Sequence, residues 1–170
     1  MSDKNKNWIL AIAITLAFIS SSAFAMTNWH TQTIVDDMDD SSVTLAVTLT
    51  DDYDGFFTGA MLMAVCSDNT LGVAVKYQGE VFFESSVKAE VRFGKGPIES
   101  VGKWYVTNDS SAIKPLMAPP IINKLMENFI NEDQFVIRIH PTYGSIVTSK
   151  FNTTGSDELN SVLQACNMEL

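Results

Sequence analysis

Hydrophobic and polar residues alternate along much of the first two thirds of the chain, and this period of two predicts β-strands. In residues 43–49 every second residue is Val or Leu and the others are Thr or Ala, which predicts a half-buried strand. Residues 61–65 are apolar throughout, as is typical of a central strand. The pattern as a whole predicts strands at residues 43–49, 56–66, 71–77, 81–85, 87–93 and 101–106, joined by turns of hairpin length.

The last third of the chain contains two segments with helical spacing of apolar residues. They are residues 121–130, which follow Pro119-Pro120, and residues 157–166. Strands are expected at 135–140 and 146–151. Because most elements are strands joined by hairpins, we expect a mainly β (α+β) fold, an antiparallel β-sandwich or open barrel with two short helices.

The first 25 residues have the features of a Sec-type signal peptide. Lys4 and Lys6 precede an apolar run at residues 8–19, and Ala23-Phe24-Ala25 supplies small residues for cleavage after Ala25. The run is shorter than the roughly 20 residues that span a bilayer. We therefore expect residues 1–25 to be removed and residues 26–170 to form a single β-rich periplasmic domain, with no stable membrane span after cleavage.

The charge of the chain is strongly acidic. Eleven Lys and Arg stand against 20 Asp and Glu, which gives a net charge of −9, and removal of residues 1–25 changes it to −10. An acidic surface repels phosphate backbones, so a nucleic-acid partner is not expected. Apolar residues make up 46% and charged residues 18% of the chain, which is the composition of a globular protein.

Two cysteines, Cys66 and Cys166, are present. In an oxidising compartment two cysteines of one chain most often form a disulfide, and this one would close a loop of about 100 residues. Neither belongs to a C-x-x-C motif, and neither has a basic neighbour that would lower a thiol pKa. A structural disulfide is therefore expected rather than a reactive thiol pair.

The sequence offers no catalytic or metal-binding motif. No serine lies in a G-x-S-x-G elbow, and His30 and His140 belong to no H-E-x-x-H or H-x-H pattern. The acidic turn at residues 51–55 lacks the end ligands of a calcium loop. We expect no catalytic residue, no metal and no cofactor. A cell-wall hydrolase with paired carboxylates is the enzyme alternative, because the spacing of such a pair is three-dimensional.

One set of polar residues is a candidate binding site. Glu90 and Arg92 point outward from the predicted strand 87–93, and Arg138 and His140 point outward from the predicted strand 135–140. If these strands are neighbours, the four side chains form one polar stripe. Arginine is favoured in carboxylate contacts and at interfaces. The alternative is a cross-strand ion pair on a solvated sheet face.

The order of short motifs between residues 29 and 166 resembles that of a known family. The motifs are Trp29, Asp39-Asp40-Ser41, the apolar strand that ends at Cys66, Asn69, Glu90-Val91-Arg92-Phe93, Gly96-Pro97, Trp104, Phe135-Val136-Ile137-Arg138-Ile139, Pro141, Phe151, Gly155 and Ala165-Cys166. In this order they resemble the VasI/TagO-type proteins, small exported proteins associated with type VI secretion systems.

The resemblance implies an accessory or interaction protein of the cell envelope that acts by protein binding and has no established enzyme activity. Its partner would be an envelope or secretion-apparatus protein. The alternative is an envelope binding or inhibitor protein carried by a phage or mobile element, for example one that acts in superinfection exclusion. The resemblance supplies no catalytic residues.

Overall fold

The computed structural model describes residues 29–35, 41–52, 59–80, 82–108, 110–116, 118–155 and 157–169. The predicted signal peptide, residues 36–40 and residues 53–58, which include part of the acidic turn, lie outside these ranges. The described elements, in chain order, are β1 (His30–Val35), β2 (Ser42–Leu49), β3 (Ala60–Ser67), β4 (Thr70–Tyr77), β5 (Ser86–Phe93), β6 (Glu99–Val106), β7 (Ala112–Lys114), α2 (Pro119–Asn131), β8 (Gln134–His140), β9 (Val147–Asn152) and α3 (Asp157–Ala165).

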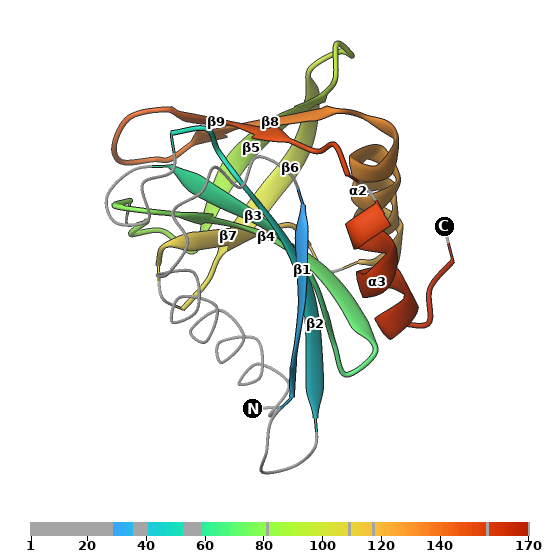
Figure 1. Ribbon diagram of the computed structural model, residues 1–170. Coiled ribbons are helices and arrows are strands. Elements are labelled where there is room, and N and C mark those ends of the chain that lie inside the picture. The colour runs from blue at the N-terminus through green and yellow to red at the C-terminus, as the bar shows by residue number, and fades with distance from the viewer. Residues whose placement is uncertain are drawn as a thin grey trace.

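All nine described strands form one antiparallel sheet in the order β1-β2-β3-β4-β7-β6-β5-β8-β9 (Figure 1). The sheet is open, because its edge strands β1 and β9 are not paired with each other. It curves so far that β9 meets the end of β2. Thr50 forms a bridge with Phe151, and the Thr48 hydroxyl donates to the carbonyl of Asn152 at 3.0 Å. The predicted fold class, mainly β (α+β) with an antiparallel β-sandwich or open barrel and two short helices, is confirmed: the described sheet is antiparallel and not closed.

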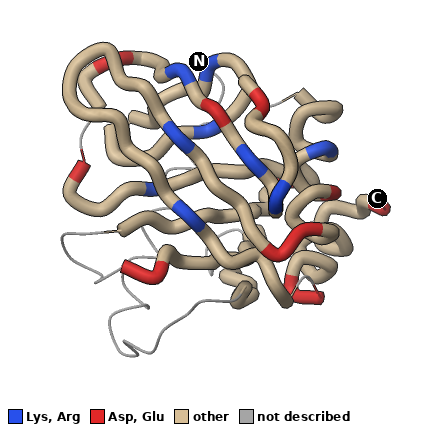
Figure 2. Tube along the Cα trace, turned by 90° about the horizontal axis from the view of Figure 1, so that it is seen from above, with Lys and Arg blue, Asp and Glu red and all other residues tan. Residues whose placement is uncertain are grey.

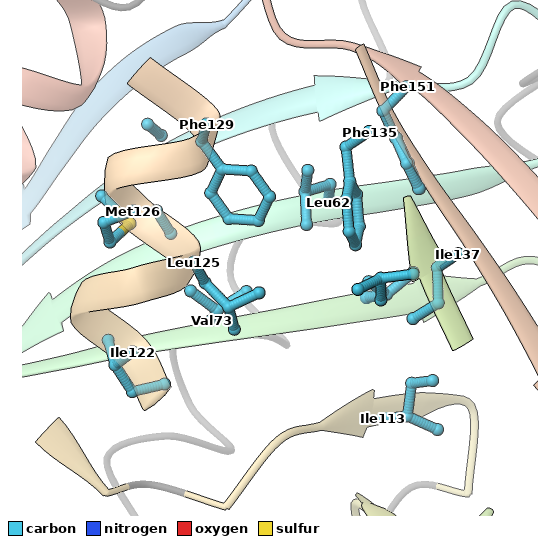
Figure 3. Packing of buried hydrophobic residues seen from close by; sticks show 14 of the residues in the cluster. Leu62, Val73, Ile113, Ile122, Leu125, Met126, Phe129, Phe135, Ile137 and Phe151 are labelled. Atoms are coloured by element: carbon cyan, nitrogen blue, oxygen red, sulfur yellow. The ribbon is translucent and has the colours of Figure 1, made fainter. Parts of the chain in front are cut away.

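Helix α2 begins with the two prolines, as predicted, and its apolar side packs on the inner face of the sheet. Leu125 and Phe129 point toward Val73 and Leu62, which lie on the central strands (Figure 3). Phe129 also stands edge-on to Phe135, with 5.1 Å between the ring centroids. Such aromatic pairs add to the free energy gained by burial of the rings, so α2 is fixed to the strands on both sides of the core.

Helix α3 ends in a motif that positions Cys166. Asn167 adopts a left-handed φ of +53°, and the amides of Asn167 and Met168 donate to the carbonyls of Gln164 and Leu163. This is a Schellman cap, which satisfies carbonyls that the end of a helix leaves unbonded. Cys166 follows the last residue of α3 and is bonded to Cys66 of β3, with 5.6 Å between the Cα atoms. The predicted disulfide is confirmed.

Strand β2 differs from its prediction as a half-buried strand. Every residue from Thr44 to Thr50 is buried, on both faces. Its Val and Leu residues face away from the main core and pack with Met61, Met63 and Val65 of β3 in a second apolar cluster, whereas Ala46 faces the main core. The alternation was therefore correct, but the larger residues point to the convex side of the sheet.

The strand predicted at residues 81–85 is wrong in its described part, which is an irregular segment. Phe82 is buried and its amide donates to the carbonyl of Ser110 at 2.7 Å, whereas Phe83 is exposed to solvent. Strands β1 and β7 were not predicted. No helix in the described ranges is long and apolar enough to cross a membrane.

Candidate interaction surface

The four residues of the predicted polar stripe lie on neighbouring strands. Strands β5 and β8 are paired, with Glu90 opposite Arg138 and Lys88 opposite His140. Their alternate residues are buried in the core, so Glu90, Arg92, Arg138 and His140 all lie on the outer face of the sheet. The alternation that predicted the stripe therefore gave the correct face for each residue.

Glu90 is the centre of this stripe. Its carboxylate oxygen lies 3.2 Å from Nε2 of His140 and 3.8 Å from Nη1 of Arg138. Nε of Arg138 also donates to the hydroxyl of Thr148 on β9 at 3.4 Å. The cross-strand ion pair considered in the sequence analysis is thus present, but it occupies only part of the stripe. Arg92 stands opposite the half-buried Val136 and forms no ion pair with a described carboxylate.

Three lysines extend the stripe and were not predicted as part of it. Lys103 of β6 stands directly opposite Lys88, and Lys150 of β9 stands opposite Val136. A β-bulge at Gly102, whose φ is +79°, sets the register of the Lys88–Lys103 pair, and glycine adopts this φ at little cost. We call the surface formed by Lys88, Glu90, Arg92, Lys103, Arg138, His140 and Lys150 the basic face.

The basic face is unusual for a chain of net charge −9. Figure 2 shows Lys and Arg along the strands of the upper face, and Asp and Glu mainly around its margins. Like charges directly opposite each other, such as Lys88 and Lys103, destabilise a strand pair. Among the described residues, no carboxylate forms an ion pair with either lysine. The face can therefore accept anionic groups from outside the chain.

Two loops meet at one end of the basic face. The carboxylate of Glu84 accepts hydrogen bonds from the backbone amide of Thr142 at 2.9 and 3.0 Å, and also from its hydroxyl. This contact ties the segment before β5 to the turn between β8 and β9. It holds Phe83 close to the turn that contains Tyr143 and Ile146, and all three side chains are exposed. The residue pattern gave no signal for this contact, because it joins positions 58 residues apart.

The described residues hold no cluster of three or more metal-ligating side chains. His30 lies on β1 and His140 on β8, which are not paired strands. Inside the core, burial raises the pKa of the Tyr77 phenol well above its ordinary value, and neighbouring Ser149 offsets only part of this effect. The Tyr77 side chain is enclosed in the core and so cannot contact a partner.

The outer surface of β5, β6, β8 and β9 is therefore the part of the described molecule best suited to contact an anionic group. Comparison with known proteins adds no assignment to it, because the chain matches no family model, no curated protein and no solved structure.

Proposed function

We propose that this chain is an exported accessory protein of the bacterial envelope that acts by binding another protein through its basic face. The gathering of basic side chains on one sheet face of an acidic chain carries this proposal. A face of opposite sign to the rest of the surface favours one orientation in an encounter and raises the association rate with a complementary partner.

We expect the partner protein to contact mainly the part of the basic face around Arg92 and Lys150. Both are exposed, and both stand beside Val136, which contributes an apolar surface between two cations. An arginine guanidinium binds carboxylates through two parallel hydrogen bonds, and arginine is frequent among residues that dominate binding energy. The partner is expected to present carboxylates around a small apolar patch.

Two observations support export. The disulfide between Cys66 and Cys166 is the kind of bond that persists in oxidising compartments, and residues 1–25 have the composition of a secretory signal. The resemblance to VasI/TagO-type proteins suggests a component of a type VI secretion apparatus, or another envelope protein, as the partner. Periplasmic location and this partner class are parts of the same proposal.

Affinity capture from the native envelope tests the proposal. The tagged, disulfide-bonded chain would be compared with the double variant Arg92→Ala, Arg138→Ala and with the control Lys95→Ala, Lys124→Ala. The control removes the same charge from a turn and from α2, outside the basic face. We expect one protein to be recovered with the wild type and the control and to be lost with the first variant. Equal recovery by all three proteins would contradict the proposal.

A further inference from the structure

Four exposed apolar side chains gather at the end of the basic face where β5 begins and β8 ends. Their exposed fractions are 88% for Phe83, 76% for Tyr143, 61% for Ile146 and 43% for Tyr105. The contact between Glu84 and Thr142 brings the segment that carries Phe83 close to the turn that carries Tyr143 and Ile146. The amide of Val106 donates to the carbonyl of Ser85 at 3.0 Å, which places β6 and Tyr105 beside them. We call these four side chains the apolar rim.

Two lysines follow directly behind the rim. Tyr105 stands opposite Ser86, and two residues further along these strands Lys103 stands opposite Lys88. Lys88 in turn stands opposite His140 on its other side. The outer surface therefore changes from aromatic and aliphatic groups to basic groups over two residues along the strands. We call Lys103 and Lys88 the lysine row.

We propose that the apolar rim and the lysine row dock this protein on the surface of an anionic phospholipid membrane. Tyrosine and phenylalanine side chains on loops enter the boundary between headgroups and acyl chains, where an apolar body and a polar end are both accommodated. Lysine ammonium groups behind them reach the lipid phosphates through flexible stems. The side-chain order along the strands matches the depth order of these layers.

The charge of the rest of the molecule orients this docking. The chain is acidic overall, so an anionic membrane repels most of its surface and attracts the basic face. The attraction acts within a Debye length of about 8 Å at physiological ionic strength, which requires the lysines to come close to the phosphates. Insertion of the apolar rim brings the lysines close to the phosphates, because Lys103 is only two residues from Tyr105 on the same strand.

The two ends of the basic face then bind different partners, the lysine end a membrane and the arginine end a protein. Lysines border the apolar rim, where point charges suit scattered phosphates, whereas Arg92 and Arg138 lie farther along the strands. Membrane docking through the first end leaves the arginines beside the membrane, where a second protein can reach them. The docking goes beyond the proposed protein contact and does not require it.

Cosedimentation with vesicles tests the docking directly. The mature, disulfide-bonded chain would be mixed with vesicles of phosphatidylcholine that contain phosphatidylglycerol, and with vesicles of phosphatidylcholine alone. We expect binding to the anionic vesicles that weakens as salt is raised, and little binding to the neutral ones. The variant Lys88→Gln, Lys103→Gln should lower the partition coefficient about tenfold or more, because each lysine near an anionic surface contributes a several-fold factor.

Matched controls separate docking from general surface effects. The variant Phe83→Ser, Tyr143→Ser should also lose about tenfold of the partitioning. Ile98→Ser, Leu116→Ser, which changes exposed apolar residues outside the rim, and Lys95→Gln, Lys124→Gln should bind as the wild type does. The docking proposal is overturned if the wild type does not bind anionic vesicles, or if it binds neutral vesicles equally well. It is also overturned if the control variants reduce binding as much as the variants of the rim and the lysine row. Because the vesicles contain no protein, such a failure is distinct from failure of the proposed protein contact.

Discussion

Glu90 of β5 lies directly opposite Arg138 of β8, and their charged groups approach to 3.8 Å on the outer face of the sheet. The two side chains are 26% and 47% exposed, so water screens much of their attraction. Their pairing therefore has a small effect on stability. Its larger consequence is that one carboxylate at the centre of the basic face neutralises part of the charge around it.

Replacement of Glu90 by Gln is expected to separate these two effects. The free energy of unfolding should fall by less than about 1 kcal/mol, because exposed ion pairs contribute no more than this. Binding to anionic vesicles should increase severalfold, since Arg138 and His140 lose their carboxylate partner. Urea unfolding and vesicle cosedimentation measure the two quantities. Weaker vesicle binding in Glu90→Gln would mean that Glu90 holds the two side chains in the binding geometry.

The polar stripe could be predicted from the sequence because period-two alternation assigns each side chain of a strand to a face. The lysine row could not, because the position of Lys103 opposite Lys88 depends on the bulge at Gly102, and alternation along a strand does not reveal a bulge. The apolar rim depends on the contact of Glu84 with Thr142 in irregular segments. Local pattern thus predicts the elements, whereas the site also depends on a bulge and on a contact between segments far apart in the sequence.

The missed elements have a similar physical cause. Strand β7 has three residues, which is too short for a period to show, and no residue of β1 is buried. Both strands exist because neighbouring strands supply hydrogen-bond partners, at β2 for β1 and at β4 and β6 for β7. The strand expected at 81–85 failed although its composition favours a strand, because the amide of Phe82 bonds to Ser110 rather than to a neighbouring strand.

The disulfide predicts equal effects of mutation at its two ends. Cys66→Ser and Cys166→Ser should each lower the free energy of unfolding by about 2–5 kcal/mol, because each removes the same closure of a long loop in the unfolded chain. The double variant should be no less stable than the single ones. Urea unfolding with and without a thiol reductant tests this, since the reductant should lower the wild type to the level of the variants and leave them unchanged. Additive losses would show that each cysteine stabilises the fold separately.

Phe129 is expected to be the residue on which the attachment of α2 depends. Its ring is buried and contacts the rings of Trp29, Phe93 and Phe135, at centroid distances of 5.8, 5.8 and 5.1 Å. Phe129→Ala should therefore lower the free energy of unfolding by about 3–5 kcal/mol, through lost burial and the cavity left behind. Glu127→Ala, on the exposed side of the same helix, should change it by less than about 0.5 kcal/mol. Equal losses in the two variants, measured by thermal or urea unfolding, would contradict the packing role of Phe129.

Tyr77 predicts a loss of stability at alkaline pH. Burial raises the pKa of its phenol in the folded protein above the value of 10.0 expected for an exposed tyrosine. Above that value the unfolded chain releases the phenol proton while the folded chain still holds it. The free energy of unfolding should be unaffected by this group below about pH 10 and fall by about 1.4 kcal/mol per pH unit above it.

The variant Tyr77→Phe tests this assignment, because phenylalanine keeps the ring and has no proton to lose. At neutral pH its stability should lie within about 1.5 kcal/mol of the wild type. Above pH 10 its stability should fall less steeply, so that the difference between the two proteins shrinks or reverses as pH rises. Tyr105→Phe changes a partly exposed tyrosine on the outer face and should retain the wild-type slope. Urea unfolding between pH 7 and about pH 11 measures all three slopes, and identical slopes would show that Tyr77 does not control alkaline unfolding.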